Sequence, residues 1–157
     1  MGKTATAQKT ITKRPIKKLS LPRKTQRGKR PQRRVKEETN QLIALAAAEF
    51  AIEKKATDVK ILDVRDITSL TDYFVLCSGS SALQVKAIAE NVLTKMRERG
   101  IKPWKSEGWG ANEWIIVDFV DVVVHVFSET ARSFYHLERL WSDAPQQSVL
   151  DKAAKKK

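Results

Sequence analysis

Residues 114–127 read WIIVDFVDVVVHVF, and this stretch largely decides the fold. Its only polar residues are Asp118, Asp121 and His125. Two carboxylates and an imidazole are common ligands of a catalytic metal, but two buried strands joined by a turn would have the same composition. We predict the second arrangement, with the turn near residues 119–121.

Strand geometry argues against a metal site in this stretch. A catalytic metal needs three or more ligands that converge on one point, whereas the side chains of a strand alternate between its two faces. Asp118 and Asp121 would therefore point in opposite directions on one strand, or bracket a bend. The only other histidine, His136, lies in a later helical segment. We predict no metal, no cofactor and a structural role for His125.

The segments around this hairpin alternate between helical and strand patterns. Residues 73–79, YFVLCSG, have the composition of a strand buried on both faces. A helix should follow, from Ser81, which forms a capping box with Gln84, to Gly100, which supplies the left-handed stop. Four further elements are expected: a helix over about residues 37–55, a strand over 58–65, a short strand near 102–105, and a helix over about 130–141 that buries Phe134, Leu137 and Trp141. This order predicts the α/β class, with a mixed β-sheet flanked by helices.

The positive charge of the chain is concentrated in its first residues. Of the 30 Lys and Arg residues, 14 lie within residues 1–36, where no Asp or Glu occurs, so 16 basic residues face 18 acidic ones in the remainder. We expect residues 1–36 to form a disordered basic tail, because like charges and few apolar residues leave nothing to offset the entropy of ordering. Three roles stay open: a solubilising tail, an organelle transit peptide, or an arm that binds RNA phosphates. An RNA-binding arm would use Lys13, Arg14, Lys17, Lys18, Arg23, Lys24, Arg27, Lys29, Arg30, Arg33 and Arg34.

The sequence contains no arrangement typical of catalysis. The single cysteine, Cys77, excludes an internal disulfide and lies in an apolar run, which indicates a packed thiol. The SGSS turn at residues 78–81 lacks the lysine of a P-loop, and no pair of carboxylates follows it to hold magnesium. We expect a protein that is not an enzyme. A degenerate nucleotidyltransferase that uses this turn with Asp118 and Asp121 is the enzyme alternative.

Tryptophan is unusually frequent for a small domain. Three of the four tryptophans, Trp104, Trp109 and Trp114, lie close together in the sequence. Trp, Tyr and Arg dominate the energetics of protein interfaces, so these side chains indicate a protein-binding surface. The alternative is that all of them fill the core.

Five segments together resemble the Iojap, or ribosomal silencing factor, family. They are LTDYFVLCSGSS, VKAIAENV, EG, EWIIVDFVDVVVHVF and RSFYHLERLWSDAP, in unbroken order over about residues 38–145. The resemblance implies a mixed α/β sheet related to the nucleotidyltransferase superfamily, without its catalytic carboxylates. We place the domain at residues 37–145 and expect residues 146–157 to be a flexible basic tail.

The resemblance also implies a function and a contact site. Members of this family bind the large ribosomal subunit through its ribosomal protein number fourteen at the intersubunit face. There they sterically block subunit joining and repress translation. The family's contact positions are an aromatic residue at the start of WIIVD and an apolar residue after its Asp, which correspond to Trp114 and Phe119. We extend the predicted contact to Asp118, Arg132 and Tyr135.

Two positions depart from the family pattern. Val120 stands where the family commonly has Gly, and because a β-branched residue resists positive φ, we expect a different or shifted turn. Gln84 stands where the family usually has His, so no role of that His is carried over.

Several expectations about partners and location complete this interpretation. Silencing is the leading hypothesis, and assembly of the large subunit is the alternative, with the same partner. We expect ribosomal RNA contacts through the basic tail, no membrane partner, and a homodimer as the free form. A cytoplasmic location is favoured, with plastid or mitochondrion as the alternative.

Overall fold

The computed structural model describes residues 31–150, with side chains from residue 38 onward. Its elements are α1 (Pro31–Glu53), β1 (Thr57–Asp63), β2 (Tyr73–Gly79), α2 (Ala82–Glu98), β3 (Lys105–Glu107), β4 (Trp114–Asp118), β5 (Val122–Ser128), α3 (Glu129–Tyr135), α4 (Leu137–Leu140) and β6 (Gln146–Ser148). The predicted RNA-contact residues, Lys13 to Arg34, all lie outside the part whose side chains are described.

One six-stranded sheet organises residues 38–150, with strand order β3-β4-β5-β2-β1-β6. β2 and β5 run parallel and are connected through α2, β3 and β4, and the other neighbouring strands are antiparallel. The mixed sheet and the α/β class predicted from the sequence are thus confirmed. β4 and β5 form the expected hairpin, with its turn at residues 119–121.

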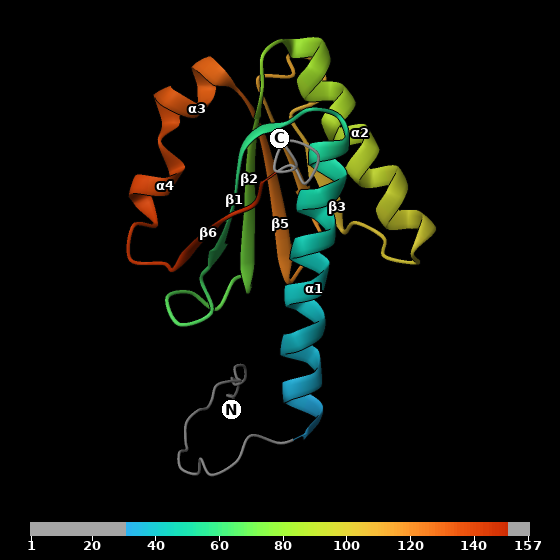
Figure 1. The fold of residues 1–157 in the computed structure, drawn as a ribbon, viewed down its shortest axis with the longest axis vertical. Helices are drawn as coiled ribbons and strands as arrows, with labels where there is room; N and C mark the ends of the chain where they lie inside the picture. Colours follow the sequence, from blue (N-terminus) through green and yellow to red (C-terminus); the bar gives the residue numbers. More distant parts are fainter. Residues whose placement is uncertain (1–30, 151–157) are drawn as a thin grey trace, which may run out of the picture. The chain divides into compact units, whose positions relative to one another are not determined.

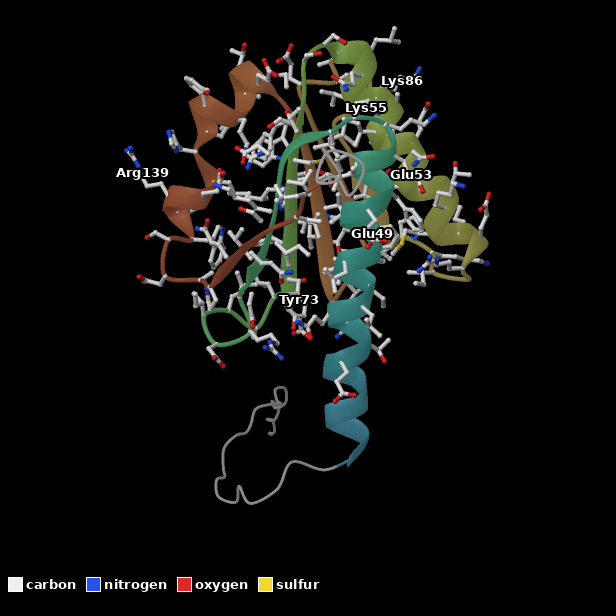
Figure 2. The ribbon with its side chains drawn as sticks, viewed as in Figure 1. Glu49, Glu53, Lys55, Tyr73, Lys86 and Arg139 are labelled. Carbon is white, nitrogen blue, oxygen red and sulfur yellow. The ribbon has the colours of Figure 1, made fainter. Side chains whose placement is uncertain are left out.

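Helices cover both faces of this sheet (Figure 1). On one face, α1 and α2 pack against alternate residues of β1, β2, β4 and β5, including Val75, Val117 and Val124. On the other face, Ala131 of α3 and Leu137 of α4 pack on strand residues such as Phe127. β2 lies between the two layers, and all seven of its residues are buried, as predicted. Arg139 on α4 extends away from the sheet (Figure 2).

The caps of α2 follow the sequence prediction closely. The Ser81 hydroxyl accepts the Gln84 N–H at 3.1 Å, and Gly100 after the helix has φ 79°. The Gln84 side chain accepts the Ser80 N–H at 2.7 Å, one residue before the position that a standard capping box would use. Its amide also donates to the carbonyl oxygens of Lys54 and Lys55 at 3.1 Å, so Gln84 ties α2 to the end of α1.

Both ends of the domain differ from the predicted boundaries. α1 begins at Pro31, six residues before the expected start, because Pro fits the first turn of a helix, where its missing N–H is not needed. Residues 146–148, expected within a flexible tail, form β6 and pair with β1. β6 consists of polar, exposed residues, so the sequence contains no apolar pattern that would predict this strand. No helix among residues 31–150 is both long and apolar enough to cross a membrane.

The helix predicted over residues 130–141 is broken in two, and this prediction was wrong. His136 adopts a left-handed conformation, with φ 51°, between α3 and α4. The break turns α4 so that Leu137 packs into the core while Phe134 is 77% exposed. Trp141 is partly buried and packs edge-on against Phe74, with ring centroids 5.2 Å apart. Of the three residues expected to be buried, Phe134 is therefore the exception.

Candidate interaction surface

Trp114 lies at the start of β4 inside a cluster of aromatic rings. Its indole stacks on Phe127 with centroids 4.9 Å apart and contacts the Tyr135 ring at 4.7 Å. Its Nε1–H donates to Nδ1 of His125 at 3.1 Å. Gly108 passes so close to the Trp114 carbonyl oxygen that a Cβ at residue 108 would overlap it. Ring packing and a hydrogen bond thus orient this half-buried indole, while Gly108 lies against the backbone of the same residue.

The helix α3 extends this cluster to the protein surface. Ser128 caps α3, and its hydroxyl donates to the Glu113 carboxylate at 2.7 Å, which ties the helix to the residue before Trp114. At the other end of α3, Tyr135 and Phe134 are exposed and stand edge-on, with centroids 5.0 Å apart. We call Trp114, Tyr135 and Phe134 the aromatic surface. Solvent-exposed aromatic side chains that rest on a rigid layer are typical of protein-binding sites.

Arg132 is buried under α3 and does not belong to this exposed surface. Its guanidinium donates to the Glu138 carboxylate at 2.7 and 3.1 Å and to the Ser78 hydroxyl at 2.8 Å. It also forms an ion pair with Asp58 at 3.3 Å. Burial opposes ionisation of Glu138, but the hydrogen bond and charge of Arg132 outweigh it and lower the pKa of that carboxyl. Arg132 therefore clamps α3 and α4 onto the sheet.

The opposite end of β4 leads into the hairpin turn. Phe119 is only 9% exposed and packs in the core beneath α1 and α2. The next residue, Val120, is 55% exposed. Asp118 is half-buried, and its Oδ1 accepts the Val120 N–H at 2.7 Å. The turn thus buries the aromatic residue that was predicted as a contact and exposes its neighbour.

The conformation of Val120 contradicts the expectation that the turn would avoid positive φ at this residue. Val120 has φ 76°, and the Asp121 N–H donates across it to the Phe119 carbonyl oxygen at 3.0 Å. A bond between residues i and i+2 around a positive φ defines a γ-turn of the rare, strained kind. Such strain costs about 1–3 kcal/mol and persists only where the surroundings impose it. Here the Asp118 carboxylate holds the Val120 N–H, and the Phe119 N–H donates to the Val122 carbonyl oxygen at 2.8 Å, so the chain is fixed on both sides of Val120.

His125 supports Trp114 from within the sheet. The indole N–H can only donate, so Nδ1 of His125 must accept and the ring proton must sit on Nε2. Burial lowers the pKa of His125 to about 3, so the ring is neutral at physiological pH. Its Nε2 is buried without a hydrogen-bond partner among the described residues. This arrangement agrees with the structural role predicted for His125.

The candidate catalytic features have structural explanations. Among residues 31–150, no three His, Cys, Asp or Glu side chains are grouped so that they could hold a metal ion. The SGSS turn is engaged in capping α2, because Ser81 binds the Gln84 N–H and Ser80 binds the Gln84 side chain. Cys77 is packed in the core, and burial raises the pKa of its thiol to about 12, which disfavours the reactive thiolate.

The five predicted contact residues therefore separate into groups. Trp114 and Tyr135 touch each other, whereas Asp118 and Phe119 lie at the far end of β4. The rise per residue of an antiparallel strand places the Asp118 backbone about 13 Å from that of Trp114. Arg132 and Phe119 are buried. The sequence interpretation missed Phe134 and Val120 as exposed apolar residues. The helical period suggested burial for Phe134, and nothing in the local pattern marks the orientation of Val120.

Comparison with known proteins identifies the family. The sequence model described as "Ribosomal silencing factor during starvation" matches residues 36–157. A protein of Bacillus subtilis (strain 168) named ribosomal silencing factor RsfS is 46% identical over 103 residues, which cover 66% of this chain and 85% of the relative. The chloroplastic protein Iojap of Zea mays is 38% identical over 104 residues, which cover 64% of this chain and 44% of that protein.

A solved structure supports the same assignment. The crystal structure of a protein from Chromobacterium violaceum matches with a TM-score of 0.62 and 34% sequence identity, and the match covers 74% of this chain and 94% of that one. The mixed sheet with its flanking helices is therefore shared with a solved protein. Because the family model covers more than half of the chain, this protein belongs to the ribosomal silencing factor family.

Proposed function

We propose that this protein represses translation by binding the large ribosomal subunit and sterically blocking its joining with the small subunit. The partner we propose is ribosomal protein number fourteen of the large subunit, at the intersubunit face. Membership of the ribosomal silencing factor family supports ribosome association. The observation that carries the proposal within this chain is the aromatic surface, where exposed rings rest on a fixed indole.

The aromatic surface supplies the anchor in this proposal. Trp114 and Tyr135 present ring faces and edges that are already ordered, so little side-chain entropy is lost when a partner covers them. Phe134 adds a third ring at the rim. We assign supporting roles to Arg132 and Phe119, because their side chains are buried in the chain by itself.

Silencing by occlusion requires no chemical step. A folded domain docked on the intersubunit face would overlap the volume that the small subunit occupies after joining. The inhibition would follow the occupancy of the site and would show no turnover. The proposal therefore assigns no catalytic residue and no cofactor.

The basic tail would add a second, less specific contact. Its 14 basic and no acidic residues within residues 1–36 could neutralise phosphates of ribosomal RNA. Each neutralised phosphate steepens the fall of log affinity with log salt by roughly 0.9 on a duplex. Deleting residues 1–30 leaves the described helix α1 intact and should flatten this slope. An unchanged slope would remove the RNA role of the tail.

The experiment that tests silencing is subunit joining followed by light scattering. Purified large subunits are incubated with the protein before small subunits are added, and joining is read as an increase in scattered intensity. We expect the wild-type protein to suppress the increase. Trp114→Ala should need about 30-fold more protein for the same effect, since a central interface tryptophan is worth roughly 2 kcal/mol. Trp114→Phe keeps an aromatic ring, so the amount of this variant needed for the same suppression should lie between those of the wild type and Trp114→Ala.

Normal joining with large subunits saturated by the protein would reject the silencing proposal. The assembly alternative predicts a different pattern: cells without the protein would accumulate precursors of the large subunit, seen in sucrose gradients, while mature subunits join normally. The enzyme alternative predicts saturable binding of a nucleotide with magnesium, measured by calorimetry.

Two further parts of the proposal concern the free protein. We propose that it forms a homodimer before it meets the ribosome, and light scattering on the purified chain measures this directly.

We also propose a cytoplasmic location, with plastid or mitochondrion as the alternative. Fluorescence microscopy of a tagged chain distinguishes these locations.

A further inference from the structure

The outermost strand, β6, covers one edge of β1. In the sheet order β6 comes last, directly after β1 (Figure 1). The Asp63 N–H donates to the Pro145 carbonyl oxygen at 2.9 Å, and the Val149 N–H donates to the Val59 carbonyl oxygen at 2.9 Å. Between these two bonds, Gln147 lies opposite Ile61. Because hydrogen-bonded pairs alternate along an antiparallel ladder, the backbone groups of residues 59, 61 and 63 point toward β6.

The intervening residues of β1 bond to the strand on the opposite side. The Val64 N–H donates to the Asp72 carbonyl oxygen at 3.0 Å, and Leu62 lies opposite Phe74 of β2. The amides of residues 62 and 64 are therefore held inside the sheet, whereas the amides of residues 61 and 63 point to β6. Two sets of amides within β1 thus report separately on its two neighbouring strands.

Few apolar contacts hold β6 in place. Its three residues, Gln146–Ser148, are polar and exposed. Ala144 is buried just before the strand, and Val149, just after it, is half-buried at the margin of the core. Segments with few buried apolar contacts open locally at a small cost in free energy. β6 should therefore separate from β1 far more readily than β2 does.

A surface hollow of about 150 Å³ adjoins β6. It is lined by Gln41 of α1, Ile61 and Asp63 of β1, Tyr73 of β2, and residues 145–147. Protein interiors are close-packed, and side chains that line a gap lose dispersion contacts on that side. The hollow therefore weakens the attachment of β6 to the rest of the domain.

Without β6, β1 would present an open edge that matches the same edge of a second copy. Unpaired N–H and C=O groups on a strand edge are a template for pairing with another chain. Antiparallel pairing of two β1 strands about a two-fold axis at Ile61 would place Val59 opposite Asp63 of the second copy. The Val59 carbonyl oxygen would then accept the Asp63 N–H of that copy. These two groups are the ones that β6 now engages.

We propose that β6 is a removable cap on β1, and that β1 pairs with β1 of a second copy when β6 is displaced. Two strands, β5 and β2, separate β1 from β4, so this contact uses a different part of the sheet from Trp114. Self-association through β1 goes beyond the proposed function and does not depend on ribosome binding.

Hydrogen exchange of the wild-type chain, followed by NMR, tests whether the cap opens. Opening of β6 releases the amides of Ile61 and Asp63 and leaves those of Leu62 and Val64 bonded to the β2 side. After correction for intrinsic rates, the first pair should exchange at least about tenfold faster than the second. Equal protection of the four amides would overturn the inference.

Two proline variants of the full chain test what the open edge binds. Gln147→Pro removes the amide that faces Ile61, so it should displace β6. Ser148→Pro is the matched control, because the amide of residue 148 points away from β1, where proline is tolerated on an edge strand. In light scattering at equal concentration, Gln147→Pro should show at least about twice the mass of the wild type, and Ser148→Pro the wild-type mass. Wild-type mass for Gln147→Pro would reject pairing with a second copy.

A second substitution tests whether β1 is the contact. Adding Asp63→Pro to the Gln147→Pro chain removes the N–H that would bond to Val59 of the second copy, so the mass should return to that of the wild type. A double variant that stays heavy would place the association elsewhere and overturn the inference. If Gln147→Pro fails to fold, judged by circular dichroism, β6 is an essential strand and the cap is rejected. None of these measurements uses the ribosome, so the proposed function stands or falls separately.

Discussion

The two ends of β4 present apolar side chains in contrasting ways. At the first end, Trp114 is held by ring stacking, a hydrogen bond to His125 and the clamped helix α3. At the other end, backbone hydrogen bonds force Val120 outward in a strained turn. Favourable packing fixes the side chain at the first end. At the other end, hydrogen bonds hold Val120 in a backbone conformation that a β-branched residue disfavours. Rigidity at a surface can therefore come from either source, and substitutions should affect the two ends differently.

The largest expected effect concerns the clamp behind the aromatic surface. Arg132→Ala would leave the Glu138 carboxylate and the Ser78 hydroxyl without their main partner, so we expect a loss of about 3 kcal/mol of unfolding free energy in urea. The matched control is Arg65→Ala, which breaks the more exposed ion pair with Asp63 and should cost below about 1 kcal/mol. Equal losses for the two variants would contradict a special role for the buried clamp.

A smaller effect concerns His125, which supports Trp114, and should appear in the pH dependence of the unfolding free energy. His125 has a pKa near 6.5 when unfolded and about 3 when folded, so between these values the unfolded state binds the extra proton. The stabilising contribution is complete above pH 6.5 and is lost as pH falls toward 3. The wild type should lose about 2 kcal/mol of unfolding free energy from pH 7.5 to 5, measured by urea titration.

The variant His125→Asn serves as the comparison for this pH effect. It places an oxygen near the former Nδ1, where it can still accept the Trp114 N–H, but it does not titrate. Its stability should change less than that of the wild type over the same pH range. Parallel curves for the two proteins would mean that burial does not disfavour the imidazolium.

The smallest effect concerns Asp118 at the strained end. Asp118→Ala removes the acceptor of the Val120 N–H and should cost about 1 kcal/mol of unfolding free energy and weaken large-subunit binding. Asp118→Asn keeps an acceptor oxygen and should restore both properties. If Asp118→Asn binds as weakly as Asp118→Ala, the charge of Asp118 contacts the partner directly and its role is not confined to the turn.

The sequence predicted those features that local patterns encode. The buried strand β2 and the capped helix α2 follow from an apolar run and from the Ser81–Gln84 spacing, and both are confirmed. The hairpin of β4 and β5 follows from its two acids, which bracket the bend. These signals are contained within short segments, so no tertiary information was needed.

Features that depend on tertiary contacts were missed. The break at His136 allows Arg132 to bind Glu138 while Leu137 packs in the core. The residue types around His136 do not predict this break. The positive φ of Val120 goes against the preference of a β-branched residue, so the residue type by itself predicts the wrong conformation. β6 is three polar residues that gain their structure only by pairing with β1.

Side-chain footprinting with hydroxyl radicals tests the central claim, that β4 and its surroundings form the contact face, most directly. The oxidation rates of exposed apolar residues are compared in the free protein and with saturating large subunits. We predict slower oxidation of Phe134, Tyr135 and Trp104 on binding, with unchanged rates at Leu42 and Leu83, which are exposed on α1 and α2. Protection of Leu42 and Leu83 with no change at the three aromatic residues would contradict the account.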